Sequence, residues 1–178
     1  LIARLDDDDY SLPNRLMSQL KFMEAHPKVS LCGSRFQELH RGRLVAQRVP
    51  FVQTNTEIKR IMSFYNPFAH SSVMFRHDAY FKVGGYSKKY TISMDYDLWL
   101  RLMDVGDVCN IDEAFTVVRL HNNSVSMKQE RLKILEGIKI RTRAYRKFRG
   151  NILLVGFYFL KSTVGLILPR WMKVSLEN

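Results

Sequence analysis

Short apolar runs alternate along this chain with polar stretches that carry helix signals. Residues 1–5 predict the end of a buried strand, and apolar side chains at helical spacing then predict a helix from near Ser11 to His26. Gly42 marks an expected hairpin turn within the mixed segment 34–53. Further strands are expected at 29–32, 71–75, 108–111 and 114–120, and further helices from Thr54 or Thr56 to about Phe64, from Asp78 to Gly84, from Asp95 or Asp97 to near Gly106, and over 124–148. This alternation predicts an α/β fold with a mixed sheet covered on both faces.

The last part of the chain has a different pattern. Residues 152–168 are almost wholly apolar, but Lys161 interrupts them and two glycines weaken the helix. This length is at the lower limit for crossing a bilayer. Basic residues before the run and Trp171 after it favour a helix that lies on a membrane surface. Packing against other parts of a larger protein and a true membrane span remain alternatives.

Composition and charge indicate which kinds of partner this chain can bind. The 178 residues fit one domain of ordinary size, and the formal net charge is +11. Twelve Lys and Arg against three Glu follow residue 127, so a charge of +9 lies there, which attracts anionic lipid or phosphate polymers. Aromatic side chains are not interleaved with these basic residues, which disfavours nucleic acid as a partner.

The start of the chain and its two cysteines indicate whether the sequence is part of a longer protein and which cell compartment it faces. Leu1 opens directly on an apolar run, so we expect an internal piece of a longer protein, with no signal peptide at this start. Cys32 and Cys109 lie in apolar surroundings without a CxxC pattern. They predict reduced core residues in a protein facing the cytosol.

Three polar segments stand out at boundaries between expected elements: Asp6 to Asp9, Ser93 to Asp97, and Arg119 to Ser126. Open α/β sheets place ligands at such boundaries. Carboxylates on a strand end suit Mg²⁺ or Mn²⁺, although an acidic turn or a helix cap would use the same residues. His121 is either a ligand or an ordinary loop histidine, and His70 precedes a strand where it can line a pocket.

Five segments in order resemble motifs of family 2 glycosyltransferases, enzymes of the GT-A fold. The resemblance is carried by RLDDDDYSLPNRL at 4–16, NPFAHSSVMFR at 66–76, VGGY at 83–86, MDYDLWLRL at 94–102 and RLHNNSVS at 119–126. It implies a partial GT-A, Rossmann-like mixed sheet flanked by helices, with a C-terminal basic and apolar helical extension. It also implies that residues 1–126 are the C-terminal portion of the catalytic domain, without its N-terminal nucleotide-binding half, and that 127–178 form a basic amphipathic helix and a membrane-associating tail.

The same resemblance implies roles for individual residues. Asp95 corresponds to the general base that deprotonates the acceptor hydroxyl. The nucleotide-sugar donor is expected to contact Asp6, Asp8, Asp9, His70 and Arg119, and the divalent cation, Mn²⁺ or Mg²⁺, is expected at Asp6, Asp8 and His121. Two departures from the family pattern are Met94, where a Glu usually precedes the base, and Asp7, where the D-x-D motif usually has a small residue.

The resulting hypothesis is an inverting hexosyltransferase of cell-surface polysaccharide synthesis. It would transfer a sugar to a glycan or lipid-linked acceptor while peripheral on the inner, cytoplasmic face of an anionic membrane. Two alternatives from other classes remain. One is a metal-dependent phosphoester hydrolase built on the aspartates, and the other is a non-catalytic, basic membrane-binding module.

Overall fold

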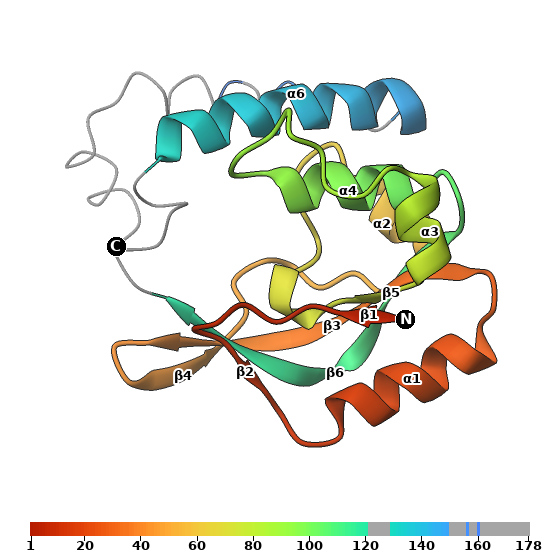
Figure 1. Ribbon diagram of the computed structural model, residues 1–178. Coiled ribbons are helices and arrows are strands. Elements are labelled where there is room, and N and C mark those ends of the chain that lie inside the picture. The colour runs from red at the N-terminus through yellow and green to blue at the C-terminus, as the bar shows by residue number, and fades with distance from the viewer. Residues whose placement is uncertain (121–128, 150–155, 157–159, 161–178) are drawn as a thin grey trace.

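The computed structural model describes residues 1–120, 129–149, 156 and 160, and Figure 1 shows the arrangement of their elements. The strands are β1 (Ile2–Ala3), β2 (Tyr10–Ser11), β3 (Val29–His40), β4 (Arg43–Ala46), β5 (Met74–Phe75) and β6 (Asp107–Leu120). The helices are α1 (Arg15–Ala25), α2 (Asn55–Ile61), the short 3-10 helix η1 (His70–Ser72), α3 (His77–Lys82), α4 (Met94–Leu102) and α6 (Glu130–Phe148).

The strands form one mixed sheet in the order β1-β5-β3-β6-β2, with β4 added as a hairpin partner of β3. β3 and β6 run parallel at its centre, and the remaining pairs are antiparallel. Helices cover both faces, with α1 on one side and α2, α3 and α4 on the other (Figure 1). The expected α/β class with a mixed sheet flanked by helices is confirmed.

The two central strands are longer than the sequence pattern predicts. β3 continues to His40 although a short strand ending at Gly33 is expected, and the two expected strands 108–111 and 114–120 are one strand, β6. The register between β3 and β6 shifts near Ser34 and Arg35, which lets one strand accommodate the acidic pair at 112 and 113. The polar interruption is therefore an irregularity within a strand.

Each face of the sheet has its own apolar core. Leu31 and Phe75 of the sheet pack with Trp99 of α4 and Ile140 of α6 on one face. On the other face, Met23 of α1 packs on Val29, Cys32 and Met74. Cys32 and Cys109 are adjacent on β3 and β6 and both are free thiols, with Cys32 fully buried.

Two expectations for the first part of the chain are wrong, one about the start of α1 and one about β1. Ser11 does not cap this helix, because it belongs to β2 and pairs with Thr116 of β6. Asn14 is the N-cap instead, with a φ of 65°, in the left-handed region that asparagine tolerates. β1 is also not a buried strand: it lies at a sheet edge, and the flanking Leu1 and Leu5 are 47% and 44% exposed.

Other local predictions are confirmed. Thr54 caps α2, where it accepts a hydrogen bond from the Glu57 backbone N–H while the Glu57 carboxylate accepts one from the Thr54 N–H. Gly42 has a φ of 80° and forms the turn between β3 and β4.

Three predictions concern residues that are not described: the role of His121, the apolar segment 152–168 apart from residues 156 and 160, and most of the proposed tail. Among the residues that are described, no helix is long and apolar enough to cross a membrane.

Candidate functional site

The four aspartates form a turn directly after β1. The Asp9 N–H donates to the Asp6 carbonyl at 3.2 Å, which closes a tight turn with Asp7 and Asp8 at its tip. The buried Ser71 hydroxyl fixes this turn from the neighbouring η1. It accepts from the Asp6 backbone N–H at 3.0 Å and donates to the Asp9 carboxylate. The Ser71 side chain therefore links both ends of the acidic turn.

Asp9 also contacts the end of β6. Its Oδ1 accepts from the Arg119 backbone N–H at 2.8 Å. Burial raises the pKa of Asp9, and the hydrogen bonds from Ser71 and Arg119 oppose that rise. The Arg119 side chain is exposed and contacts the Tyr10 hydroxyl and ring.

Asp6 is paired with His70. The distance from His70 Nδ1 to Asp6 Oδ1 is 2.9 Å, and this hydrogen bond lowers the pKa of Asp6 against the opposing effect of burial. Arg4 donates from Nε to His70 Nε2 at 3.3 Å and from its guanidinium to Asp6 Oδ1 at 3.4 Å. Because the Arg4 Nε–H can only donate, His70 Nε2 acts as an acceptor, and the proton of the ring lies on Nδ1, facing Asp6.

Asp95 occupies the first turn of α4. Its Oδ2 accepts from the Asn66 side-chain amide at 3.0 Å. Burial raises the pKa of Asp95, and hydrogen bonds from the backbone N–H groups of Asp95 and Tyr96 act in the opposite direction. A half-buried carboxylate whose pKa is raised, in the first turn of a helix, has the properties expected of a general base.

Tyr86 links the surroundings of Asp6 to those of Asp95. The Tyr86 hydroxyl lies 2.8 Å from His70 Nε2. Burial raises the pKa of Tyr86 to about 12, and both Asp6 and Asp95 add to that rise through their charges. Asp6 therefore contacts the His70 imidazole, and the charges of Asp6 and Asp95 both act on the Tyr86 hydroxyl, although the two aspartates are far apart in the sequence.

Asp97 has a different role from its neighbour Asp95. It is buried and bonded to Arg101 of α4 at 2.7 Å and to Arg143 of α6 at 2.5 Å. The carboxylate thus joins two helices and is fully engaged in ion pairs.

The structure brings several of the predicted site residues together, with Asp6 in direct contact with His70 and with Asp9, and Asp95 bonded to Asn66, four residues before His70. Asp8 lies in the same turn, and Arg119 contributes through its backbone. Sequence reasoning did not single out Asn66, Ser71 or Tyr86, although all three lie inside the segments that carry the resemblance. Asn66, rather than the missing Glu at position 94, is the side chain that bonds Asp95.

The fit to a divalent cation depends on how many ligands the chain supplies. Within the described residues, no group of three or more His, Cys, Asp or Glu side chains is placed to hold a metal ion. Magnesium is commonly held by one or two carboxylates, with substrate phosphates and water completing its shell. The oxygen donors of Asp6 and Asp8 fit a site of that kind.

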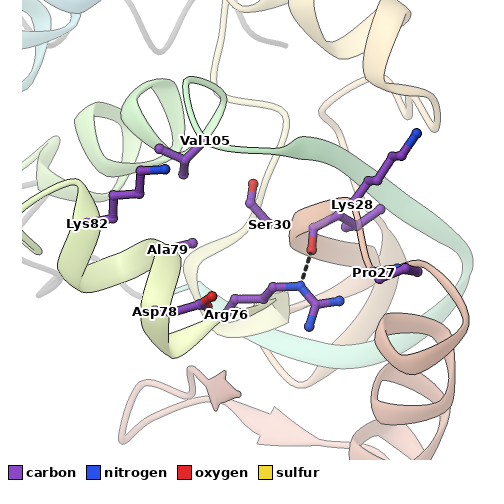
Figure 2. Close-up of a pocket in the computed structure, with 9 residues that line it drawn as sticks. Pro27, Lys28, Ser30, Arg76, Asp78, Ala79, Lys82 and Val105 are labelled. Atoms are coloured by element: carbon purple, nitrogen blue, oxygen red, sulfur yellow. Dashed lines mark hydrogen bonds between the residues drawn. The ribbon is translucent and has the colours of Figure 1, made fainter.

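A separate pocket of about 200 Å³ lies at the other end of β5 (Figure 2). Its lining includes Lys28, Arg76 and Lys82, but none of the predicted site residues. Arg76 donates to the carbonyls of Val29 and Met23, so its guanidinium ties β3 to the end of α1. This arrangement identifies Arg76 as a structural residue.

Comparison with known proteins gives relatives of one kind. The chain is 31% identical over 176 residues to the amylovoran biosynthesis glycosyltransferase AmsE of Erwinia amylovora, a match covering 95% of this chain and 63% of that protein. It is 30% identical over 169 residues to the O-antigen biosynthesis glycosyltransferase WbnJ of Escherichia coli, covering 92% and 65%. The relatives of this chain are named glycosyltransferases. The chain spans slightly less than two thirds of their length, and no family model matches it.

A solved structure supports the fold. The crystal structure of S. aureus TarS superposes with a TM-score of 0.51 at 13% sequence identity, covering 82% of this chain and 27% of that one. At this identity the similarity concerns the fold alone.

Proposed function

We propose that this chain is the C-terminal catalytic portion of an inverting family 2 glycosyltransferase. The donor is a nucleotide sugar, and the acceptor is a hydroxyl of a glycan or of a lipid-linked glycan. Relatives named for amylovoran and O-antigen biosynthesis support polysaccharide synthesis as the process.

The observation that carries this proposal is that Asp6 bonds His70, whose imidazole lies 2.8 Å from the Tyr86 hydroxyl, and that the charges of both Asp6 and Asp95 raise the pKa of that hydroxyl. A sugar transfer needs a donor-binding group and a base on two sides of a single reacting carbon. Asp6 follows β1 and Asp95 lies in the first turn of α4, and the charges of both carboxylates raise the pKa of the Tyr86 hydroxyl, which is bonded to His70.

In the proposed reaction, Asp95 accepts the proton of the acceptor hydroxyl. The acceptor oxygen then attacks the anomeric carbon, the new glycosidic bond forms, and the bond from that carbon to the diphosphate oxygen breaks. The Asn66 amide orients the Asp95 carboxylate. Arg4 and His70 orient Asp6, and Ser71 holds the acidic turn against the donor.

Asp6 and Asp8 are the residues that would hold a divalent cation, and His121 is a further candidate outside the described residues. Such a cation supplies positive charge that stabilises the departing diphosphate. Asp9 and Arg119, joined through the Arg119 backbone, would border the donor at the same edge.

Replacing Asp95 by Asn in the full-length protein tests this proposal. The amide cannot accept the acceptor proton, so turnover should fall by about 100-fold or more, as for loss of a general base. Donor binding measured by calorimetry should change little, because Asp95 is assigned to the acceptor side. Radiolabelled nucleotide sugars, with and without acceptor, provide the assay.

Asp104→Asn is the matched control, since Asp104 is an exposed aspartate at the end of α4 that pairs with Lys147. It should retain wild-type turnover. Unchanged turnover in Asp95→Asn would remove Asp95 from the base role. Release of phosphate from phosphoesters without sugar transfer would instead favour the hydrolase alternative.

A further inference from the structure

A buried carboxylate of α6 holds the segment that leads into α4. Glu136 is 5% exposed, and its Oε1 accepts from the Thr91 backbone N–H at 2.8 Å. Its Oε2 accepts from the N–H groups of Ile92 at 2.9 Å and Ser93 at 2.8 Å. Three consecutive backbone donors thus converge on one side chain.

These donors stand immediately before the candidate base. Ser93 is the N-cap of α4, and Asp95 lies in the first turn of that helix. The Ser93 side chain makes no capping hydrogen bond. A carboxylate that binds successive amides fixes the path of the backbone as a cap does, and here it comes from a helix far along the chain.

The rest of α6 reinforces the same attachment. Ile140 and Ala144 are fully buried within the core shared with α4. Arg143 pairs with Asp97, one turn along α4 from the segment that Glu136 holds. In Figure 1, α6 lies across the outer side of α4, with the loop before α4 reaching up to it. The start of α4 is therefore held by α6 at two points, Glu136 and Arg143.

We propose that Glu136 is a positioning residue, which sets the place of Asp95 by holding residues 91–93. The inference rests on the proposed base role of Asp95 and adds a requirement for α6 in the site. Glu136 itself makes no contact with the reacting atoms. Its effect passes through three backbone hydrogen bonds to the first turn of α4.

The substitution Glu136→Gln in the full-length protein tests this inference. The amide keeps one acceptor oxygen, but its NH₂ faces backbone donors, so at least one bond is lost. Amide hydrogen exchange at residues 91–93 should then accelerate by about tenfold or more. A displaced base should lower kcat by about 10- to 100-fold. The KM for the donor should stay within about threefold, because donor contacts lie on other elements.

Two further variants complete the experiment. Glu136→Asp keeps the charge with a shorter side chain and should recover part of kcat and part of the exchange protection. It also takes over the test if Glu136→Gln does not fold. Asp104→Asn removes another contact between α6 and the region of α4 but leaves residues 91–93 untouched, so both readouts should match the wild type.

The inference is overturned if a folded Glu136→Gln variant keeps wild-type kcat, or if exchange at residues 91–93 is unchanged. An increase in donor KM with normal kcat would also overturn it, since it would place the effect on the donor side. A different result would contradict the proposed function itself, namely normal turnover in the Asp95→Asn variant.

Discussion

At the scale of single residues, the carboxylates of the candidate site have contrasting surroundings. The His70 hydrogen bond keeps the pKa of Asp6 below its usual value, whereas burial raises the pKa of Asp9 and of Asp95. Opposed shifts of this kind assign different chemical tasks to residues of one type. Asp6 is suited to remain an anion at low pH, and Asp95 is suited to take up a proton.

The raised pKa of Asp95 leads to a prediction about pH. A base works only when ionised, and a raised pKa means that Asp95 becomes protonated at a higher pH than an exposed aspartate. Transfer measured as kcat/KM should therefore fall as the pH decreases, with a midpoint above the ordinary value of 3.8. A pH-rate profile of the full-length enzyme gives this midpoint. A midpoint at or below 3.8 would contradict the assignment.

The sequence identified the charged residues of the site better than their neutral partners. Clustered aspartates at element boundaries predict an oxygen-rich site, and the structure places Asp6 against His70 and Asp9 against the adjacent Ser71. The orienting groups Ser71 and Tyr86 could not be selected, because a single hydroxyl in an apolar segment gives no signal until its distance to a carboxylate is known. Glu136 likewise looks like an ordinary acid in a basic helix.

At the scale of elements, one buried arginine joins α1 to the strands beneath the site. Arg15 is 1% exposed and donates to the carbonyls of Arg4 at 2.6 Å and Val73 at 3.2 Å. Its Nε–H donates to Gln19 on the next turn of α1. These bonds secure the chain directly before the acidic turn and directly after Ser72.

Removal of this guanidinium should loosen that connection. Arg15→Met leaves the two carbonyls without their donor, so the free energy of unfolding should fall by about 1–3 kcal/mol. Lys21→Met is the matched control, because Lys21 lies exposed on the same helix and should change stability by less than about 0.5 kcal/mol. Urea denaturation of the two variants and the wild type measures the difference. Equal stability of both variants would show that Arg15 does not anchor these strands.

The boundaries of helices and strands were predictable where neighbouring residues determine them. They were not predictable where pairing within the sheet determines them. The Thr54 cap and the Gly42 turn depend on neighbouring residues and were found from sequence. Ser11 has the chemistry of a helix cap, yet pairing with β6 draws it into the sheet. The length of β6 was missed for the same reason, since its parallel partner carries it through the acidic interruption.

At the scale of the whole molecule, charge and apolar surface coincide on α6. The basic side chains Arg131, Lys139 and Arg146 are exposed along this helix, and Leu132 and Leu135 are 37% and 48% exposed among them. Basic residues combined with exposed leucines are typical of helices that lie at a membrane surface. This surface supports the proposal of peripheral association with an anionic, inner membrane face.

Vesicle binding tests that proposal. The full chain should sediment with vesicles containing anionic lipid and not with neutral phosphatidylcholine vesicles, and salt should weaken the binding. Replacing Arg131, Lys139 and Arg146 together by Gln should cost about 1 kcal/mol of binding free energy for each side chain. The triple replacement Lys21→Gln, Lys28→Gln and Lys59→Gln, in other parts of the chain, serves as the charge-matched control. Equal binding to both kinds of vesicle would contradict an electrostatic contribution.

The overall class was the most predictable property of the molecule. Alternating apolar strands and helices predict an α/β sheet, and the structure has one. The strand order was not predictable, because it depends on pairings between residues such as Val29 and Asp107 that leave no local pattern. The contacts of Asp6 with His70 and Ser71 depend on that order, because β1 pairs with β5.

The central pairing of β3 with β6 also has a consequence for how the protein is made. Val29 pairs with Asp107, and His40 pairs with Leu120, so β3 and β6 can pair only after the whole segment from β4 to α4 has been synthesised. Contacts of such large sequence separation slow folding, because the entropy of loop closure is lost before they form. Asp9 receives its Arg119 donor from the last part of β6. During synthesis, the acidic turn therefore leaves the ribosome before β6 does. Until β6 has emerged, Asp9 lacks the hydrogen bond from the Arg119 backbone N–H.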